Sequence, residues 1–133
     1  MTSKNLARKA ALCALTKKAF DIAILDLRKL TSMADFFVVC SADSDTQVKA
    51  IADAIRDGLE ELGEKPWHRE GYSDANWILL DFVTVVIHVF HKETRSFYNL
   101  EKLWGDATFE YIEDKPAVKI LRRKARSARK VGS

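Results

Sequence analysis

The sequence contains few of the residues that mark several common classes of protein. Its 133 residues include only two prolines and five glycines, too few for a collagen-like or proline-rich chain. The two cysteines, Cys13 and Cys40, are far apart in the chain and form no CxxC motif. This excludes a disulfide framework and a zinc knuckle, and it favours a reducing compartment. We therefore expect a cytoplasmic protein, and an organelle matrix is an alternative that the sequence leaves open.

Long hydrophobic runs are also missing. The longest uncharged apolar stretch covers residues 82–90, about half of the roughly 20 residues that a membrane helix needs. Hydrophobic residues make up 47% of the chain and charged residues 31%, as in ordinary soluble proteins. The sequence therefore predicts a globular protein with a single core and no membrane partner.

Acidic residues are absent from the end of the chain. Eight basic residues follow Asp114, starting with Lys115, and no acid accompanies them. Residues 1–114 hold 14 basic and 19 acidic residues, which gives that part a net charge of −5. We therefore divide the chain into an acidic domain over residues 1–114 and a basic, mobile tail over residues 115–133. The two parts are expected to attract different partners.

The spacing of the apolar residues predicts an α/β (α+β) fold with a mixed sheet of about five strands and flanking helices. The expected strands at residues 77–82 and 84–90 are joined by almost no linker, so this pair is antiparallel. The expected helices are residues 4–20, 43–62 and 93–104, and the expected strands are residues 22–27, 36–40, 66–70, 77–82 and 84–90.

Motifs for catalysis are scarce. The chain has neither a glycine-rich phosphate loop nor a G-x-S-x-G elbow. Asp43 and Asp45 form a D-x-D pair that could hold Mg²⁺, with Asp81 as a third carboxylate, but capping of the helix that starts there is the favoured interpretation. His88 and His91 could be metal ligands, but the favoured interpretation is that one imidazole packs in the core and the other lies at the surface. We therefore predict no catalytic residues, no metal site and no cofactor.

The strand at residues 77–82 has an unusual composition. Period-two alternation places Trp77, Leu79 and Asp81 on one face, where an indole lies two pleats from a carboxylate. An exposed indole leaves apolar surface in water, and a carboxylate on a buried face needs a partner. A partner protein that covered this face would solve both problems, with Trp77 as anchor and Asp81 beside a basic group. The alternative is that the chain's own helix at residues 93–104 covers the indole.

Further candidates lie near the same strand. Glu70, Gly71 and Asp74 stand just upstream, and Tyr98 lies off the apolar stripe of the last predicted helix. The apolar stripe of that helix, predicted as core, consists of Phe97, Leu100 and Trp104. The acids and aromatic residues near the strand favour a binding surface. The predicted partner-binding residues are Trp77, Asp81, Glu70, Gly71, Tyr98, Asp74 and Leu79.

Several motifs resemble the ribosomal silencing factor (Iojap-like) family. The most specific are W-x-L-L-D, V-x-H-x-F and F-Y-x-L-E-x-L-W, and the resemblance spans roughly residues 5–107. One departure is the turn Val83-Thr84, where the family usually has a Gly-Asp type turn. The other is a more acidic helix entry over residues 42–46. The segments that carry the resemblance are residues 26–27, 31–41, 47–53, 70–71, 76–81, 86–90 and 95–106.

The resemblance implies a non-enzymatic translation repressor with a nucleotidyltransferase-like sheet that lacks the catalytic signature. Such proteins bind the large ribosomal subunit through its universal protein number fourteen and sterically block the joining of the small subunit. A homodimer through the same sheet surface is also compatible with the sequence. Two other functions stay open, namely a metal-dependent nucleotidyl or phosphoryl transferase and a nucleic-acid-binding module.

The basic tail lies outside the resemblance. Beside a ribosome it would meet the phosphates of ribosomal RNA, and each contact would make binding more sensitive to salt. The alternative is a solvated tail that only aids solubility. The predicted RNA-contacting residues are Arg122, Arg123, Lys124 and Arg126.

Overall fold

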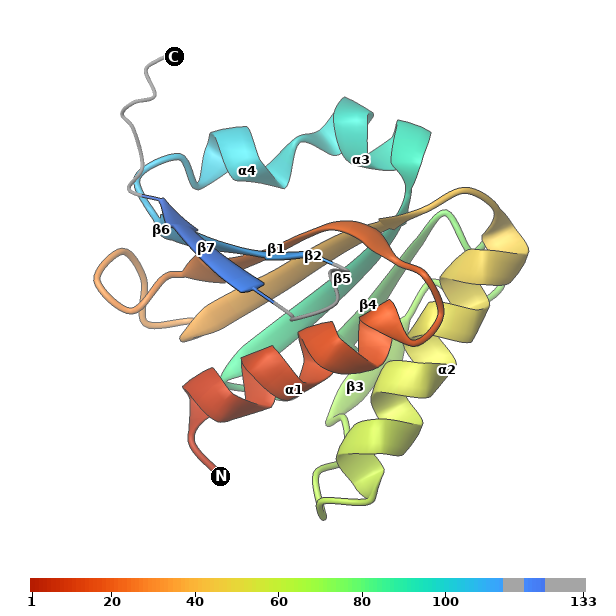
Figure 1. Ribbon diagram of the computed structural model, residues 1–133, viewed down its shortest axis with the longest axis horizontal. Helices are drawn as coiled ribbons and strands as arrows, with labels where there is room; N and C mark the ends of the chain where they lie inside the picture. Colours follow the sequence, from red (N-terminus) through yellow and green to blue (C-terminus); the bar gives the residue numbers. More distant parts are fainter. Residues whose placement is uncertain (114–118, 124–133) are drawn as a thin grey trace.

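The computed structural model describes residues 1–113 and the strand at residues 119–123 (Figure 1). The helices are α1 (Ser3–Leu15), α2 (Asp45–Glu60), α3 (Lys92–Tyr98) and α4 (Leu100–Leu103), and the strands are β1 (Phe20–Asp26), β2 (Phe36–Ala42), β3 (His68–Glu70), β4 (Trp77–Asp81), β5 (Val85–His91), β6 (Thr108–Glu113) and β7 (Lys119–Arg123). Among the described residues, no helix is both long and apolar enough to cross a membrane.

The strands form one mixed sheet in the order β3-β4-β5-β2-β1-β6-β7. The strands β2 and β5 run parallel, and the other neighbouring strands run antiparallel. The predicted fold class and the predicted antiparallel pairing of β4 with β5 are therefore confirmed. The described part of the sheet has seven strands, not about five, because β6 and β7 were not expected.

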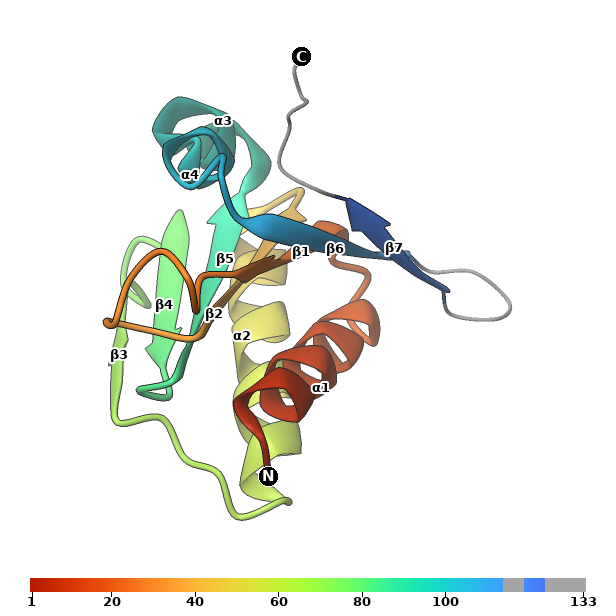
Figure 2. The ribbon, with the colours of Figure 1, turned by 90° about the vertical axis from the view of Figure 1, so that its left-hand side faces the viewer.

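The two faces of the sheet are covered unequally. The long helices α1 and α2 lie against one face, and the short helices α3 and α4 lie across the other (Figures 1 and 2). The first face builds the larger cluster of buried side chains, while the second builds a smaller cluster around Phe90 and Phe109. The smaller cover leaves part of the second face accessible.

The start of α2 confirms the capping interpretation of its acidic entry. The Ser44 hydroxyl accepts a hydrogen bond from the Gln47 backbone N–H at 3.1 Å, and Gln47 Oε1 accepts one from the Asp43 N–H at 2.6 Å. Asp45 lies in the first turn, where the helix dipole favours a negative charge. The side chains that α2 buries are Val48, Ile51, Ala52, Ile55 and Leu59.

The predicted helix over residues 93–104 is not continuous. Asn99 has a φ of 49°, which ends α3, and its side chain caps α4 by accepting from the Lys102 N–H at 3.2 Å. The break changes the face that each residue presents. As a result Phe97, predicted as core, is 81% exposed, whereas Leu100 and Trp104 pack against the second cluster.

The end of the chain also differs from the prediction. The strand β6 pairs with β1 and buries Phe109, Glu110 and Ile112. Arg8 of α1 holds the Glu110 carboxylate at 3.0 Å, which explains how an acid can lie in a buried position. Within the segment predicted as a tail, Lys119–Arg123 form β7 beside β6. Residues 114–118 and 124–133 lie outside the described part.

Candidate partner-binding surface

The two faces of β4 differ as the alternation predicts. Ile78 and Leu80 are fully buried on the side of α2, whereas Trp77, Leu79 and Asp81 are half-buried on the opposite face. The register pairs Leu79 with His88 of β5, so these two residues stand side by side on the sheet. The predicted division of the strand into a core face and a second, more accessible face is therefore confirmed.

Trp77 is neither an open anchor nor a sealed core residue. Its ring lies with its centroid 4.8 Å from those of Phe90 and Tyr98, so α3 covers part of the indole. Its Nε1–H donates a hydrogen bond to His88 Nδ1 at 3.1 Å. The helical cover of Trp77 therefore comes from Tyr98. Much of the contribution of the indole is therefore to the stability of the fold.

Two hollows lie along this face of β4. The first, which we call the acidic hollow, has a volume of about 470 Å³ and is lined by Gly71, Asp74, Asn76, Trp77, Glu93, Thr94, Phe97 and Tyr98. The second, which we call the apolar groove, has a volume of about 510 Å³, and its larger lining side chains are Met33, Phe37, Trp67, Leu79, Val86 and Trp104. The two meet at the hydrogen bond between Trp77 and His88.

The predicted partner-binding residues divide between these hollows. Four of them line the acidic hollow, and two, Leu79 and Asp81, line the apolar groove. The seventh, Glu70, is exposed on β3, where it pairs in register with Leu79 and binds His68. The structure thus brings all seven to one strip of surface, while their role in binding stays a prediction.

Two of the seven have structural roles of their own. Gly71 has a φ of +94°, and a Cβ there would collide with the Trp77 carbonyl, so only glycine fits. Asp81 Oδ1 accepts a hydrogen bond from the Val83 N–H at 2.8 Å and thereby holds the hairpin between β4 and β5.

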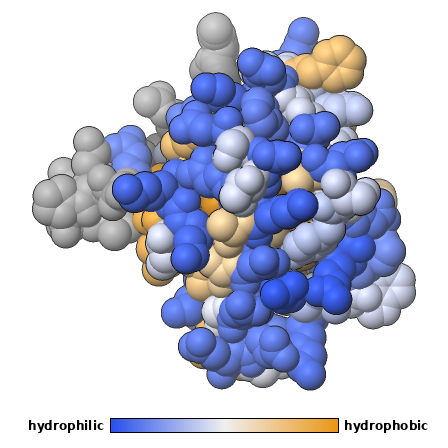
Figure 3. Space-filling view, turned by 90° about the vertical axis from the view of Figure 1, so that its right-hand side faces the viewer, coloured by the Kyte–Doolittle hydropathy of each residue, from blue (hydrophilic) through white to orange (hydrophobic). Residues whose placement is uncertain are grey.

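The sequence did not reveal the most exposed apolar residues of the apolar groove. Met33 and Trp67, which line the groove, are 85% and 77% exposed. Both lie in segments with no strong periodicity, one in a polar connection and one before a short edge strand. The composition of these two segments does not tell whether an apolar residue in them lies at the surface or in the core. The groove is lined by residues of the loop at 27–35, by residues of β4 and by Trp104, which follows α4. This loop, β4 and α4 lie on the side that faces the viewer in Figure 2. The side that carries α2 is mainly hydrophilic (Figure 3).

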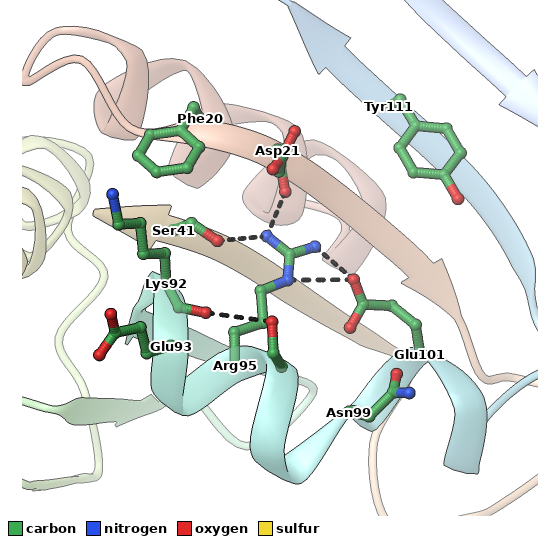
Figure 4. Close-up of a pocket in the computed structure, with 10 residues that line it drawn as sticks. Phe20, Asp21, Ser41, Lys92, Glu93, Arg95, Asn99, Glu101 and Tyr111 are labelled. Atoms are coloured by element: carbon green, nitrogen blue, oxygen red, sulfur yellow. Dashed lines mark hydrogen bonds and ion pairs between the residues drawn. The ribbon is translucent and has the colours of Figure 1, made fainter. Parts of the chain in front are cut away.

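A cavity of about 730 Å³ lies beneath α3 and contains Arg95 (Figure 4). The guanidinium donates to the Asp21 carbonyl at 2.5 Å, to the Ser41 hydroxyl at 2.8 Å, and to the Glu101 carboxylate. The Arg95 side chain is only 11% exposed. These bonds tie α3 and α4 to β1 and β2, so Arg95 positions the cover that carries Tyr98 and Trp104.

The residues of the transferase alternative lie apart. Asp43 and Asp45 follow the end of β2, where the register pairs Ala42 with His91. Asp81 pairs with Val86, at the opposite end of β5. No group of three or more His, Cys, Asp or Glu side chains in the described ranges could hold a metal ion. The three carboxylates of this alternative therefore form no common site.

The two histidines have separate structural roles, as the favoured interpretation predicts. His88 is buried, and burial lowers its pKa from 6.5 to about 3. The half-buried His91 caps α3, with its Nδ1 accepting from the Glu93 N–H at 3.3 Å. Of the predicted RNA-contacting residues, Arg122 and Arg123 belong to β7, whereas Lys124 and Arg126 lie outside the described residues.

Comparisons relate this chain to known proteins. The profile of the family described as ribosomal silencing factor during starvation matches residues 1–132. The ribosomal silencing factor RsfS of Bacillus subtilis (strain 168) is 47% identical over 107 residues, which are 80% of this chain and 91% of the relative. The chloroplastic protein Iojap of Zea mays is 40% identical over 94 residues, 68% of this chain and 40% of the plant protein. A crystal structure of a protein from Chromobacterium violaceum matches with a TM-score of 0.77 at 31% identity, over 96% of this chain and 98% of that one.

The Arg95 cluster can be tested by mutation. We expect Arg95→Ala to lower the free energy of unfolding by about 2 kcal/mol, because it removes charge-assisted hydrogen bonds and leaves Glu101 without its cation. Lys92→Ala is the matched control, because its ion pair with Asp43 is exposed and should contribute less than about 0.5 kcal/mol. Urea titration measures both values. Equal losses in the two variants would contradict the positioning role.

The buried His88 predicts a pH-dependent stability. Its folded pKa of about 3 lies below the ordinary value of 6.5, so between these values only the unfolded chain binds the proton. The free energy of unfolding should therefore fall as the pH drops below 6.5, by about 1.4 kcal/mol per pH unit from this residue.

The comparison that isolates this contribution is Trp77→Phe/His88→Phe against Trp77→Phe. Both variants lack the indole N–H that His88 accepts, so only the histidine differs. Urea titrations from pH 7 to pH 4.5 should give a shallower dependence for the double variant. Parallel curves would mean that His88 is not buried in its neutral form.

Proposed function

Because the chain belongs to the ribosomal silencing factor family, we propose that it binds the large ribosomal subunit through the universal large-subunit protein number fourteen and prevents the small subunit from joining. The protein would act in the cytoplasm as a repressor of translation. It needs no chemical step for this, because a bound protein that occupies the joining surface excludes the other subunit by volume. A slow dissociation rate is then the property that matters most.

The observation that carries the proposal is the strip along β4. The exposed apolar side chains of Trp67 and Met33 line the apolar groove together with Asp81, and Asp74 lines the adjoining acidic hollow. Ribosomal proteins are generally basic, and residues 1–114 carry a net charge of −5. Apolar anchors surrounded by complementary charge are the usual arrangement of a protein interface.

The position of Trp77 changes the role that we assign to it. Its indole packs under Tyr98 and donates to His88, so Trp77→Ala would disturb both folding and binding. Trp67 and Leu79 are better placed as anchors, because they line the groove from its rim and its floor. Trp77 then supports the surface between the two hollows.

We expect Trp67→Ala to weaken binding to purified large subunits by about 2 kcal/mol, as the truncation of an aromatic interface residue does. Its melting temperature should change little, because the side chain is 77% exposed. Leu62→Ala is the matched control, since Leu62 is 46% exposed just after α2 and lies outside the groove. Co-sedimentation at limiting concentration measures both. Undiminished binding by Trp67→Ala would remove the anchor role.

The basic end of the chain supports a second, weaker interaction. We propose that Arg122, Arg123, Lys124 and Arg126 bind phosphates of ribosomal RNA. Exchange of all four for glutamine keeps the length of β7 and should flatten the dependence of log affinity on log salt by about 0.7–0.9 for each phosphate that is no longer neutralised. An unchanged slope would rule out RNA binding by these residues, and complete loss of affinity would favour a nucleic-acid-binding module.

A further inference from the structure

The cavity beneath α3, which we call the Arg95 cavity, lies where the chain changes from one face of the sheet to the other (Figure 4). The strands β2 and β5 are the one parallel pair among the described strands. After β2 the chain enters α2 on one face, and after β5 it enters α3 on the other (Figures 1 and 2). Ser41, near the end of β2, and Lys92, directly after β5, line the cavity. In open sheets, small ligands bind in the crevice at such carboxyl ends of parallel strands.

Both cations in the lining of the Arg95 cavity are already neutralised. The Arg95 guanidinium donates to the Glu101 carboxylate, and also to the Asp21 carbonyl and the Ser41 hydroxyl. The ammonium group of Lys92 lies 3.2 Å from a carboxylate oxygen of Asp43. An anionic ligand would have to break one of these ion pairs before it could bind a cation here.

Two carboxylates of the lining have no such partner. Asp21, at the start of β1, and Glu93, in the first turn of α3, both line the cavity. Neither carboxylate forms an ion pair with another residue in the described part of the chain. The charge that remains unpaired in the lining is therefore negative, and it attracts a cation.

Two aromatic rings complete the lining. Phe20 of β1 and Tyr111 of β6 are half-buried, and in Figure 4 they stand on either side of the Arg95 side chain. The face of an aromatic ring attracts a cation, and methylene groups pack against the same face. These walls suit a cation with an apolar body better than they suit a bare metal ion.

We propose that the Arg95 cavity binds an organic cation with a methylene chain, of the class of the alkyl amines and guanidines. Its charged groups pair with Asp21 and Glu93, and its methylene groups pack against Phe20 and Tyr111. The bound ligand connects α3 with β1 and β6, so it stabilises the fold. This binding needs no ribosome, so it goes beyond the proposed function and can be tested without it.

Two sources could supply this cation. One is a free polyamine. The other is the end of the chain itself, where the sequence after β7 contains four basic residues and no acid. β7 pairs with β6, the strand that carries Tyr111, so this segment begins one strand away from the cavity wall. Its basic residues, which lie outside the described part, are Lys124, Arg126, Arg129 and Lys130.

Calorimetric titration of the full-length chain with spermidine tests the site, at about 150 mM salt, where exposed charges attract each other only at short range. We expect saturable binding and a higher melting temperature in the presence of spermidine. Asp21→Asn/Glu93→Gln should weaken the binding about fivefold or more, because it removes both unpaired charges. The backbone is kept, since asparagine tolerates the φ of 51° that Asp21 adopts.

Glu60→Gln/Glu61→Gln is the matched control. It removes the same number of charges from exposed positions at the end of α2, outside the cavity, and should bind spermidine as the wild type does. A second full-length variant carries glutamine in place of the four basic residues after β7. It removes the competing cation if the chain supplies its own.

The outcomes identify the source of the cation. If the wild type and the four-glutamine variant bind spermidine equally and Asp21→Asn/Glu93→Gln weakens both, the ligand is a free amine. If the four-glutamine variant binds at least fivefold more tightly, and Asp21→Asn/Glu93→Gln removes that gain, the cation belongs to the chain itself. Both results support the inference. It is overturned if neither chain binds saturably, if the control pair weakens binding equally, or if magnesium chloride binds as tightly as spermidine.

Discussion

The unequal cover of the sheet determines which part of this protein stays accessible to a partner. Helices α1 and α2, of 13 and 16 residues, enclose one face, whereas α3 and α4, of seven and four residues, lie across the other. The short helices bury no residue of their own completely. Their position therefore depends on a few contacts, chiefly the Arg95 hydrogen bonds and the packing of Tyr98 and Trp104. The part of the sheet that they leave accessible becomes the apolar groove.

A surface built in this way combines rigidity with exposed apolar area. The floor of the groove consists of β4 and β5, which each pair with a strand on both sides, so Leu79 and His88 are held firmly. The rim consists of Trp67, Met33 and Val83, whose side chains are mostly exposed. A firm floor lowers the entropy that ordering would cost on binding, and an exposed rim supplies the area that a partner can bury. This division fits the proposed function, in which the protein acts by remaining bound to a basic partner.

Periodicity predicted the fold class, the antiparallel pair of β4 and β5, and the two faces of β4, because each depends on burial patterns along one segment. It failed where a single residue or a distant contact decides the structure. Asn99 breaks the last helix by adopting a left-handed conformation, and β6 needs β1 and Arg8 to bury Glu110. The predicted site lies on one strip, yet Met33 and Trp67 were missed, because an exposed apolar residue looks like a core residue in the sequence. Trp77 shows the opposite error, because a residue predicted as an open anchor is partly covered by Tyr98.

Site-specific crosslinking shows which ribosomal component meets the apolar groove. A photoreactive residue in place of Trp67 would sit at the rim of the groove, where it does not disturb the core. After irradiation with purified large subunits, the account predicts one main adduct, with the universal large-subunit protein number fourteen, and no adduct from the same residue placed at Leu62. A main adduct with ribosomal RNA or with another protein would contradict it.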